Sequence, residues 1–148
     1  MENVLASDFR EFLKLLHEHE VKYLLIGGYA VNYHGYVRGT GDLDVWIAVH
    51  PDNANKIVEV LQEFGFGVPE LTPELFLKSD TIVRMGVQPV RIEISTSISG
   101  VDFDVCYAQR VTDMIDDVAV NIISLNHLKL NKQASGRLKD LADLENLP

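Results

Sequence analysis

The chain has 148 residues, 47% of them hydrophobic, and a formal net charge of −9. This length and apolar content are enough for one compact domain, and no Pro/Gly/Ser-rich tract divides the chain, so residues 1–148 are expected to form a single domain. The negative charge argues against binding of long nucleic acid, because that affinity comes mainly from lysine and arginine. Neither a membrane-length apolar run nor an apolar signal segment in Met1–Glu20 is present, which predicts a soluble, cytoplasmic protein without a membrane partner.

Cys106 is the only cysteine. An intrachain disulfide and a cysteine-rich zinc site are therefore excluded. The expected role of this side chain is that of a small buried hydrophobe.

The predicted elements alternate between helices and strands, as their hydrophobic periodicities change along the chain. In order they are a helix over 8–19, a strand over 21–26, a short helix over 29–34, a strand over 42–47, a helix over 51–64, a loop over 68–78 with a helical turn starting at Pro73, a hairpin of strands 81–85 and 90–96 joined through residues 86–89, a helix starting near Asp102, a last short strand over 118–123, and a helix from Leu125 capped by Ser124.

Two acidic residues lie on the strand predicted over 42–47. Side chains alternate along a strand, so Asp42 and Asp44 share one face roughly 6–7 Å apart, and the apolar residues between and after them share the other. Apolar neighbours lower the local dielectric and strengthen the repulsion between the two carboxylates. A bound cation would relieve this repulsion, and oxygen ligands of this kind suit Mg²⁺ (or Mn²⁺).

A glycine pair precedes these acids. Gly27 and Gly28 follow the apolar strand 21–26 and open the short helix. Without Cβ atoms they would let a polyphosphate approach the backbone, and the helix start would present free N–H groups to the anion. The pattern predicts a phosphate site next to the metal site.

A third carboxylate is expected on the second strand of the hairpin. Glu93 alternates with apolar residues there, so it lies on a polar face opposite the core. It is the natural third metal ligand or the base. The alternative is an ordinary ion pair with Arg91 or another neighbour.

A second D-x-D pair, Asp102 and Asp104, has no glycine pair before it at the corresponding interval. It follows Gly100 in the manner of a helix start, where acids are favoured. These two residues are interpreted as capping and solvated. Asp113, Asp116 and Asp117 are expected to form a solvated face.

Together these motifs resemble the nucleotidyltransferase superfamily with the DNA polymerase beta type of palm. There a hydrophobic-Gly-Gly/Ser turn precedes an Asp-x-Asp pair by about the interval found between Ile26-Gly27-Gly28 and Asp42-Leu43-Asp44-Val45. The run from Arg38 to Asp42 is similar to small stand-alone bacterial members, including those related to abortive-infection and toxin–antitoxin nucleotidyltransferases. Those relatives carry Arg-Ile-Asp where this chain has Arg91-Ile92-Glu93, and they close with a tail similar to residues 132–144.

The resemblance implies an α+β fold in which helices pack on one face of a mixed β-sheet and an acidic metal site lies on the other. It implies metal-dependent transfer of a nucleotidyl group from a nucleoside triphosphate to a hydroxyl acceptor, with release of pyrophosphate. Asp42, Asp44 and Glu93 would be the catalytic and metal-binding residues. The residues expected to bind the nucleotide are Gly27, Gly28, Arg38, Thr40 and Lys132.

The acceptor is left open between a small hydroxylated molecule, a protein side chain and an RNA end. A chain of this size has little room for a separate acceptor domain, so loop 68–80, a second copy of the chain, or a small helical protein partner is expected to contribute. The alternative function is an antitoxin-like regulatory module with the same fold that neutralises a toxin partner. Retention of three converging acids favours catalysis.

Overall fold

Residues 5–87 and 89–148 are described by the structure, which is a computed structural model. Residues 1–4 of the N-terminal segment and Gln88 in the predicted hairpin loop lie outside the described residues. The elements follow in the order α1 (Ser7–Glu18), β1 (Tyr23–Ile26), α2 (Gly27–Tyr33), β2 (Leu43–Ile47), α3 (Pro51–Phe64), the 3₁₀ helix η1 (Pro73–Leu77), β3 (Ile82–Met85), β4 (Ile92–Ser95), α4 (Phe103–Ala108), β5 (Val111–Ile115), β6 (Val118–Ile122), α5 (Leu125–Ser135) and α6 (Leu138–Asn146).

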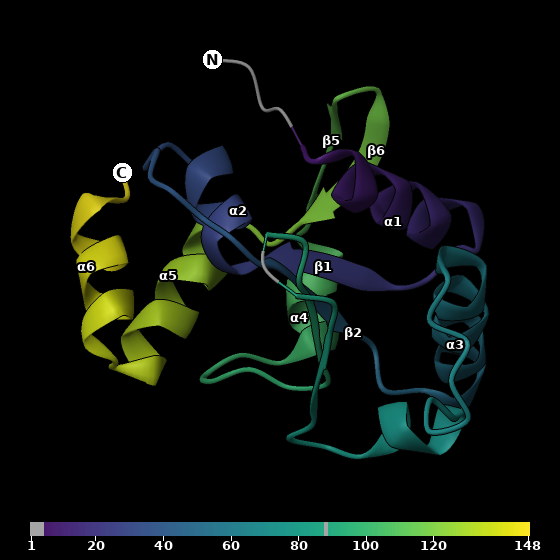
Figure 1. Cartoon of the computed structure of the whole chain (residues 1–148). Coiled ribbons are helices and arrows are strands. Elements are labelled where there is room, and N and C mark those ends of the chain that lie inside the picture. Colours follow the sequence, from purple (N-terminus) through teal and green to yellow (C-terminus); the bar gives the residue numbers. More distant parts are fainter. Residues whose placement is uncertain (1–4, 88) are drawn as a thin grey trace.

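The six strands form one mixed sheet in the order β3-β4-β2-β1-β6-β5 (Figure 1). β2 pairs with β1 antiparallel and with β4 parallel, so the strand with the Asp-x-Asp pair lies inside the sheet. β3 and β5 form the two edges, each antiparallel to its neighbour. This central place of β2 is what brings its acids next to those of β4.

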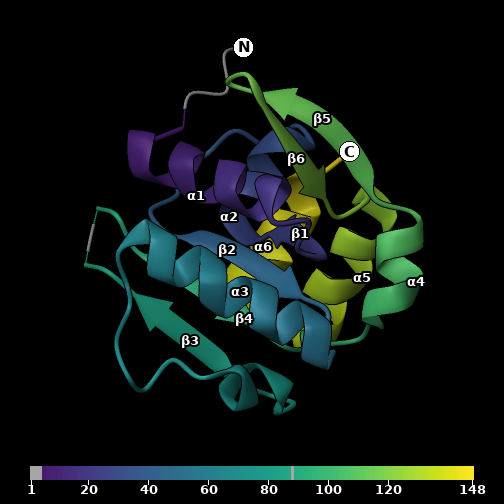
Figure 2. The same cartoon turned by 90° about the vertical axis from the view of Figure 1, so that its right-hand side faces the viewer.

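Helices α1 and α3 cover one face of the sheet, in front of it in Figure 2, while α2, α5 and α6 lie behind it. The side chains of β2 that point toward α1 and α3 are fully buried, as their alternation predicts: Leu43, Val45 and Ile47. Asp44 alternates with them and therefore lies on the opposite face. The predicted α+β fold with a mixed sheet is confirmed, and α2, α5 and α6 share the second face with Asp44.

The ends of α3 follow from local chemistry. Pro51 occupies its first turn, where a missing N–H costs nothing, and the side chain of His50 accepts a hydrogen bond from the backbone N–H of Asp52. Gly65 ends the helix with φ +109°, a left-handed conformation that a side chain disfavours. The predicted helix over 51–64 therefore has its predicted bounds.

One strand was not predicted. The three central residues of β5, Thr112, Asp113 and Met114, are exposed, and its apolar residues do not alternate with polar ones in the pattern by which strands are identified. It is held by antiparallel pairing with β6 across a two-residue turn, Asp116-Asp117, in which both residues have positive φ. Asp113, Asp116 and Asp117 are exposed as expected, but they belong to an edge strand and its hairpin turn.

Among the described residues, the helices fall short of the length and apolar character that crossing a membrane requires.

Candidate active site

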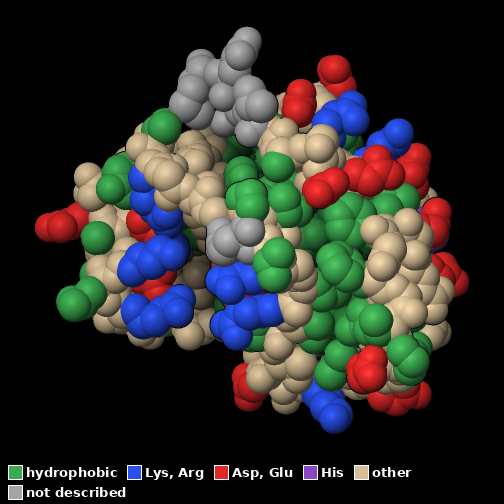
Figure 3. Space-filling view, in the orientation of Figure 1, with side chains coloured by type: hydrophobic (Ala, Val, Ile, Leu, Met, Phe, Trp, Pro, Cys, Tyr) green, Lys and Arg blue, Asp and Glu red, His purple; other side chains and the backbone are tan. Residues whose placement is uncertain are grey.

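All eight residues predicted for the site line one cavity of about 330 Å³, on the face of the sheet away from α1 and α3. They come from the β1–α2 turn, the segment before β2, strands β2 and β4, and helix α5: Gly27, Gly28, Arg38, Thr40, Asp42, Asp44, Glu93 and Lys132. The lining is almost entirely polar. Figure 3 shows Lys and Arg side chains gathered on both sides of the hollow on this face.

Asp44 and Glu93 are direct neighbours across the β2–β4 pair. Burial, the hydrogen bond with Glu93, and the charges of Glu93 and Asp42 raise the pKa of Asp44. The pKa of Glu93 is lowered, first by its hydrogen bond with Asp44 and further by Arg84, against the effect of burial. At neutral pH the two carboxyl groups therefore favour holding one proton between them, on Asp44.

Asp42 lies in the same cavity but its carboxylate faces an arginine. Arg91 donates from Nη2 to Asp42 Oδ2 at 2.8 Å and from Nε at 3.1 Å. Arg84, on strand β3, forms an ion pair with Glu93 on the neighbouring strand β4. Arg91 thus pairs with Asp42 and not with Glu93, while the neighbour that pairs with Glu93 is Arg84.

The carboxylates were tested for their fit to a hard cation. The Oδ1 atom of Asp44 is buried and makes no hydrogen bond with the described residues, which is costly unless something else binds it. Carboxylate oxygens are the ligands that Mg²⁺ and Mn²⁺ prefer. The described chain holds no preformed cluster of three such ligands. The donor chemistry fits a cation at Asp44 and Glu93, and Asp42 would join it by turning from Arg91.

Packing against neighbouring side chains requires glycine at both positions of the β1–α2 turn, and the sequence pattern alone does not show this. A Cβ on Gly27 would lie 2.1 Å from Oδ2 of Asp44, and one on Gly28 would lie 2.1 Å from Oγ1 of Thr40. Gly27 also has φ +68°. The missing side chains therefore make room for Asp44 and Thr40 themselves, so the turn sets the position of the acid.

Lys132 is buried, and its ammonium group forms two ion pairs with helix α6. Its Nζ lies 2.9 Å from Asp140 Oδ1 and 3.1 Å from Asp143 Oδ2. Arg38 donates two hydrogen bonds to Asp143, at 2.7 and 2.8 Å, and Arg137 donates to Asp140 at 2.8 Å. Three cations thus share two buried carboxylates, which leaves this wall of the cavity positive. Lys139, also on the lining, adds to that charge.

The α6 cluster predicts sensitivity to acid. Burial opposes ionisation of Asp140, but hydrogen bonds from Ser135, Lys132 and Arg137 outweigh it and lower its pKa to about 2. Because this value lies below that of the unfolded chain, about 4, the stabilisation is complete above pH 4 and is lost as the pH falls toward 2. The free energy of unfolding should drop by on the order of 2 kcal/mol across this window.

Urea unfolding at several pH values between 2 and 7 measures this loss. In Asp140→Asn the free energy of unfolding should fall less steeply with decreasing pH. Asp104→Asn, at an exposed position, should keep the wild-type pH dependence. Equal slopes in all three proteins would contradict the role given to Asp140.

The sequence pattern did not identify two residues that contribute to this site. Asp140 and Asp143 belong to the tail that resembles the small bacterial relatives, yet sequence reasoning gave them no function. Their spacing of three places them on one face of α6, and both are almost fully buried. Two acids at this spacing on the apolar side of a helix are the signal that could have identified them.

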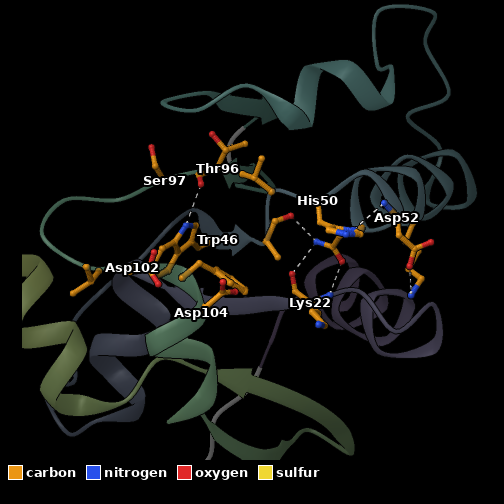
Figure 4. Close-up of a pocket in the computed structure, with 14 residues that line it drawn as sticks. Lys22, Trp46, His50, Asp52, Thr96, Ser97, Asp102 and Asp104 are labelled. Carbon is orange, nitrogen blue, oxygen red and sulfur yellow. Dashed lines mark hydrogen bonds and ion pairs between the residues drawn. The ribbon is translucent and has the colours of Figure 1, made fainter.

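The second D-x-D pair lies elsewhere, as predicted. Asp102 accepts a hydrogen bond from the N–H of Val105 and caps α4. Asp104 is exposed in the first turn of α4. Figure 4 shows both beside Trp46 in a separate cavity of about 470 Å³, across from Lys22 and His50. The capping interpretation is confirmed for Asp102.

No protein-family model matches the sequence, and no curated protein sequence matches it. Solved structures do match the fold. A candidate nucleotidyltransferase from Thermotoga maritima, TM1012, superposes with a TM-score of 0.58 at 13% identity, over 93% of this chain and 86% of that one. A nucleotidyltransferase-like antigenic protein from Paracoccidioides brasiliensis gives 0.54 at 17% identity, over 96% of this chain and 76% of that one.

The lincosamide antibiotic adenylyltransferase LnuA, solved with lincomycin bound, gives a TM-score of 0.58 at 15% identity. The superposition covers 98% of this chain and 97% of LnuA. At these identities the likeness establishes the fold. The chain has the nucleotidyltransferase fold, and the predicted resemblance is confirmed at that level.

Proposed function

We propose that this protein is a metal-dependent nucleotidyltransferase that transfers a nucleotidyl group from a nucleoside triphosphate to a hydroxyl acceptor. The observation that carries the proposal is the half-buried Asp44–Glu93 pair, with the buried and unpartnered Oδ1 of Asp44, facing a positive wall across a polar cavity. The shared fold with nucleotidyltransferases, LnuA among them, supports this reaction class.

The roles follow from the lining. Asp44, Glu93 and Asp42 would hold Mg²⁺ or Mn²⁺, which when bound withdraws charge from the phosphates and the attacking hydroxyl. Lys132, Arg38 and the other cations of the α6 wall would face the triphosphate. Gly27 and Gly28 keep the turn narrow enough for Asp44 and Thr40 to occupy their places.

In the proposed reaction the acceptor oxygen forms a bond to the α-phosphorus, and the bond from that phosphorus to the bridging oxygen breaks. Pyrophosphate leaves with the electron pair. The acceptor proton passes to a carboxylate of the site, and Glu93, kept ionised by Arg84, is placed to accept it. The positive wall stabilises the charge that accumulates on pyrophosphate.

Mg²⁺ and a nucleoside triphosphate are expected to stabilise the fold together. A ligand that binds the native state raises its stability by RT ln(1 + [L]/Kd), about 2.7 kcal/mol at a hundredfold excess over Kd. Thermal unfolding with each of the four nucleotides, with Mg²⁺ and with chelator, measures this effect. Calorimetry then gives the affinity. Absence of triphosphate binding in both Mg²⁺ and Mn²⁺ would contradict the enzyme and favour the antitoxin-like binding module.

A further inference from the structure

A second cavity opens from the active site. It has a volume of about 430 Å³ and lies between strand β4, the segment after it, and helix α5. Gly27, Asp44 and Glu93 line both this cavity and the one described above. The two spaces also share Lys132, Arg137 and Asp140, so they adjoin along the carboxylate pair and the α6 wall.

The two cavities differ in chemistry. The first adds Arg38, Lys139 and the glycine-rich segment before β2, and its surface is almost wholly polar. The second adds one cation, Arg84, and otherwise apolar side chains and small uncharged polar ones: Ile26, Ile82, Ile98, Ser95, Ser97, Ser99, Ser135 and Asn131. Phosphates suit the first lining, whereas a mixture of aliphatic carbons and hydroxyl or amide groups suits an uncharged organic molecule.

Ser95 is the residue that indicates a ligand. It is 8% exposed, it lines the second cavity, and its hydroxyl group makes no hydrogen bond with the described part of the chain. Among the described residues, Oδ1 of Asp44 is the solvent-inaccessible side-chain atom that lacks a partner, so the Ser95 oxygen is open to the cavity and can bind a ligand or water there. Ser95 is also two residues from Glu93 on β4, so both side chains lie on the same face about 6–7 Å apart.

We propose that the second cavity is the acceptor site and that the acceptor is a small polyhydroxylated molecule, such as a cyclic polyol or sugar. This inference rests on the proposed nucleotidyl transfer. One hydroxyl group of the acceptor bonds to Ser95 while another, about a sugar ring away, reaches the Asp44–Glu93 pair. The attacking oxygen bonds to the α-phosphorus, its proton goes to a site carboxylate, and pyrophosphate departs.

Size and charge favour a small acceptor over a polymer. The cavity volume is in the range that encloses small molecules, about 300–1,000 Å³. The cations that border it are already paired, Arg84 with Glu93 and Arg137 with Asp140. A chain of net charge −9 with few unpaired cations around the opening has little to attract the phosphates of an RNA end.

The test uses the uncharged polyols myo-inositol and glucose as probes, at tens of millimolar, in NMR titrations of the whole protein. The titrations are done with and without Mg²⁺ and an ATP analogue whose α–β bridging oxygen is replaced by methylene. Ser95→Ala removes the hydroxyl group, and Ser95→Val also fills the space. Thr112→Val is the matched control, because it removes a hydroxyl group from β5 at the far edge of the same sheet.

At least one probe should shift the backbone signals of Ser95, Ser97 and Asn131 and stimulate pyrophosphate release from a nucleoside triphosphate. In Ser95→Ala the KM for that probe should rise about ten-fold. Ser95→Val should abolish probe binding while the affinity for the ATP analogue stays within two-fold. Thr112→Val should behave as wild type.

Three results would overturn the acceptor site. The protein could bind Mg²⁺–nucleotide but none of the probes, or pyrophosphate release could be stimulated only by tRNA or protein. Loss of affinity for the ATP analogue in Ser95→Val would instead assign the cavity to the nucleoside. Failure of the proposed function is recognised separately, because the wild-type protein would then bind no nucleotide.

Discussion

Asp44→Asn is expected to abolish nucleotidyl transfer while leaving the fold intact and slightly more stable. Asparagine has nearly the same size as aspartate and can donate from its amide to Glu93, so it replaces the proton that the two carboxyl groups hold between them. Above the pKa of Asp44, which is raised to about 8, both carboxyl groups of the wild-type pair are charged, and the substitution removes the repulsion between them. The same change removes the anionic ligand, and transfer should fall by on the order of 10³-fold.

Two measurements on the same protein separate these effects. Pyrophosphate release in Mg²⁺ gives the loss of transfer, and thermal unfolding with chelator gives the stability. Mn²⁺ affinity from calorimetry should fall as well. Asp104→Asn, at the other D-x-D pair, should leave all three unchanged. Transfer that survives in Asp44→Asn, or is lost in Asp104→Asn, would show that the wrong pair had been assigned.

Lys132→Met is expected to lower the free energy of unfolding by about 3 kcal/mol, a large effect for a single substitution. Methionine fills a similar volume but leaves Asp140 and Asp143 buried with one cation fewer. Arg137 and Arg38 still pair with them, so the loss should be smaller than for a completely unpaired buried charge. Transfer should fall too, because the wall that faces the triphosphate loses its central charge.

Lys129→Met is the matched control, one turn earlier on α5. Lys129 is a half-buried side chain whose Nζ donates a hydrogen bond only to the carbonyl oxygen of Pro148 within the described residues and pairs with no carboxylate, so its replacement should change stability little. Adding Asp140→Asn to Lys132→Met should restore part of the lost stability, since it removes one of the two buried carboxylates that lost a cation. Equal effects of the two lysine substitutions in urea unfolding would rule out the buried network.

Much of the site was predictable because its signals are local. Alternation along β2 alone puts Asp44 opposite Leu43 and Val45, and the same rule puts Glu93 on the polar face of β4. The two strands pair in the register that makes these acids neighbours. Whether Asp42, Asp44 and Glu93 act as predicted remains to be measured, but the structure places them in one cavity with the other five residues.

The partners of these residues were not predictable from local pattern. The sequence left open, as an alternative for Glu93, an ion pair with Arg91 or another neighbour; in the structure that neighbour is Arg84, and Arg91 pairs with Asp42. Two arginines near two acids allow both pairings, and only the register of β3 against β4 decides between them. Strand β5 was missed for a similar reason, because an exposed edge strand depends on its neighbour rather than on its own apolar residues.

By itself, the sequence determined the mixed sheet with an acidic face, the glycine turn, and the acids on β2 and β4. These depend on periodicity and on residues close together in the chain. The tertiary structure alone decided that a second cavity opens beside Ser95, that Gly27 makes room for Asp44, and that Lys132 and Arg38 are held by α6. Arg38 and Asp143 are 105 residues apart, and a contact over that distance follows from how the sheet and helices pack.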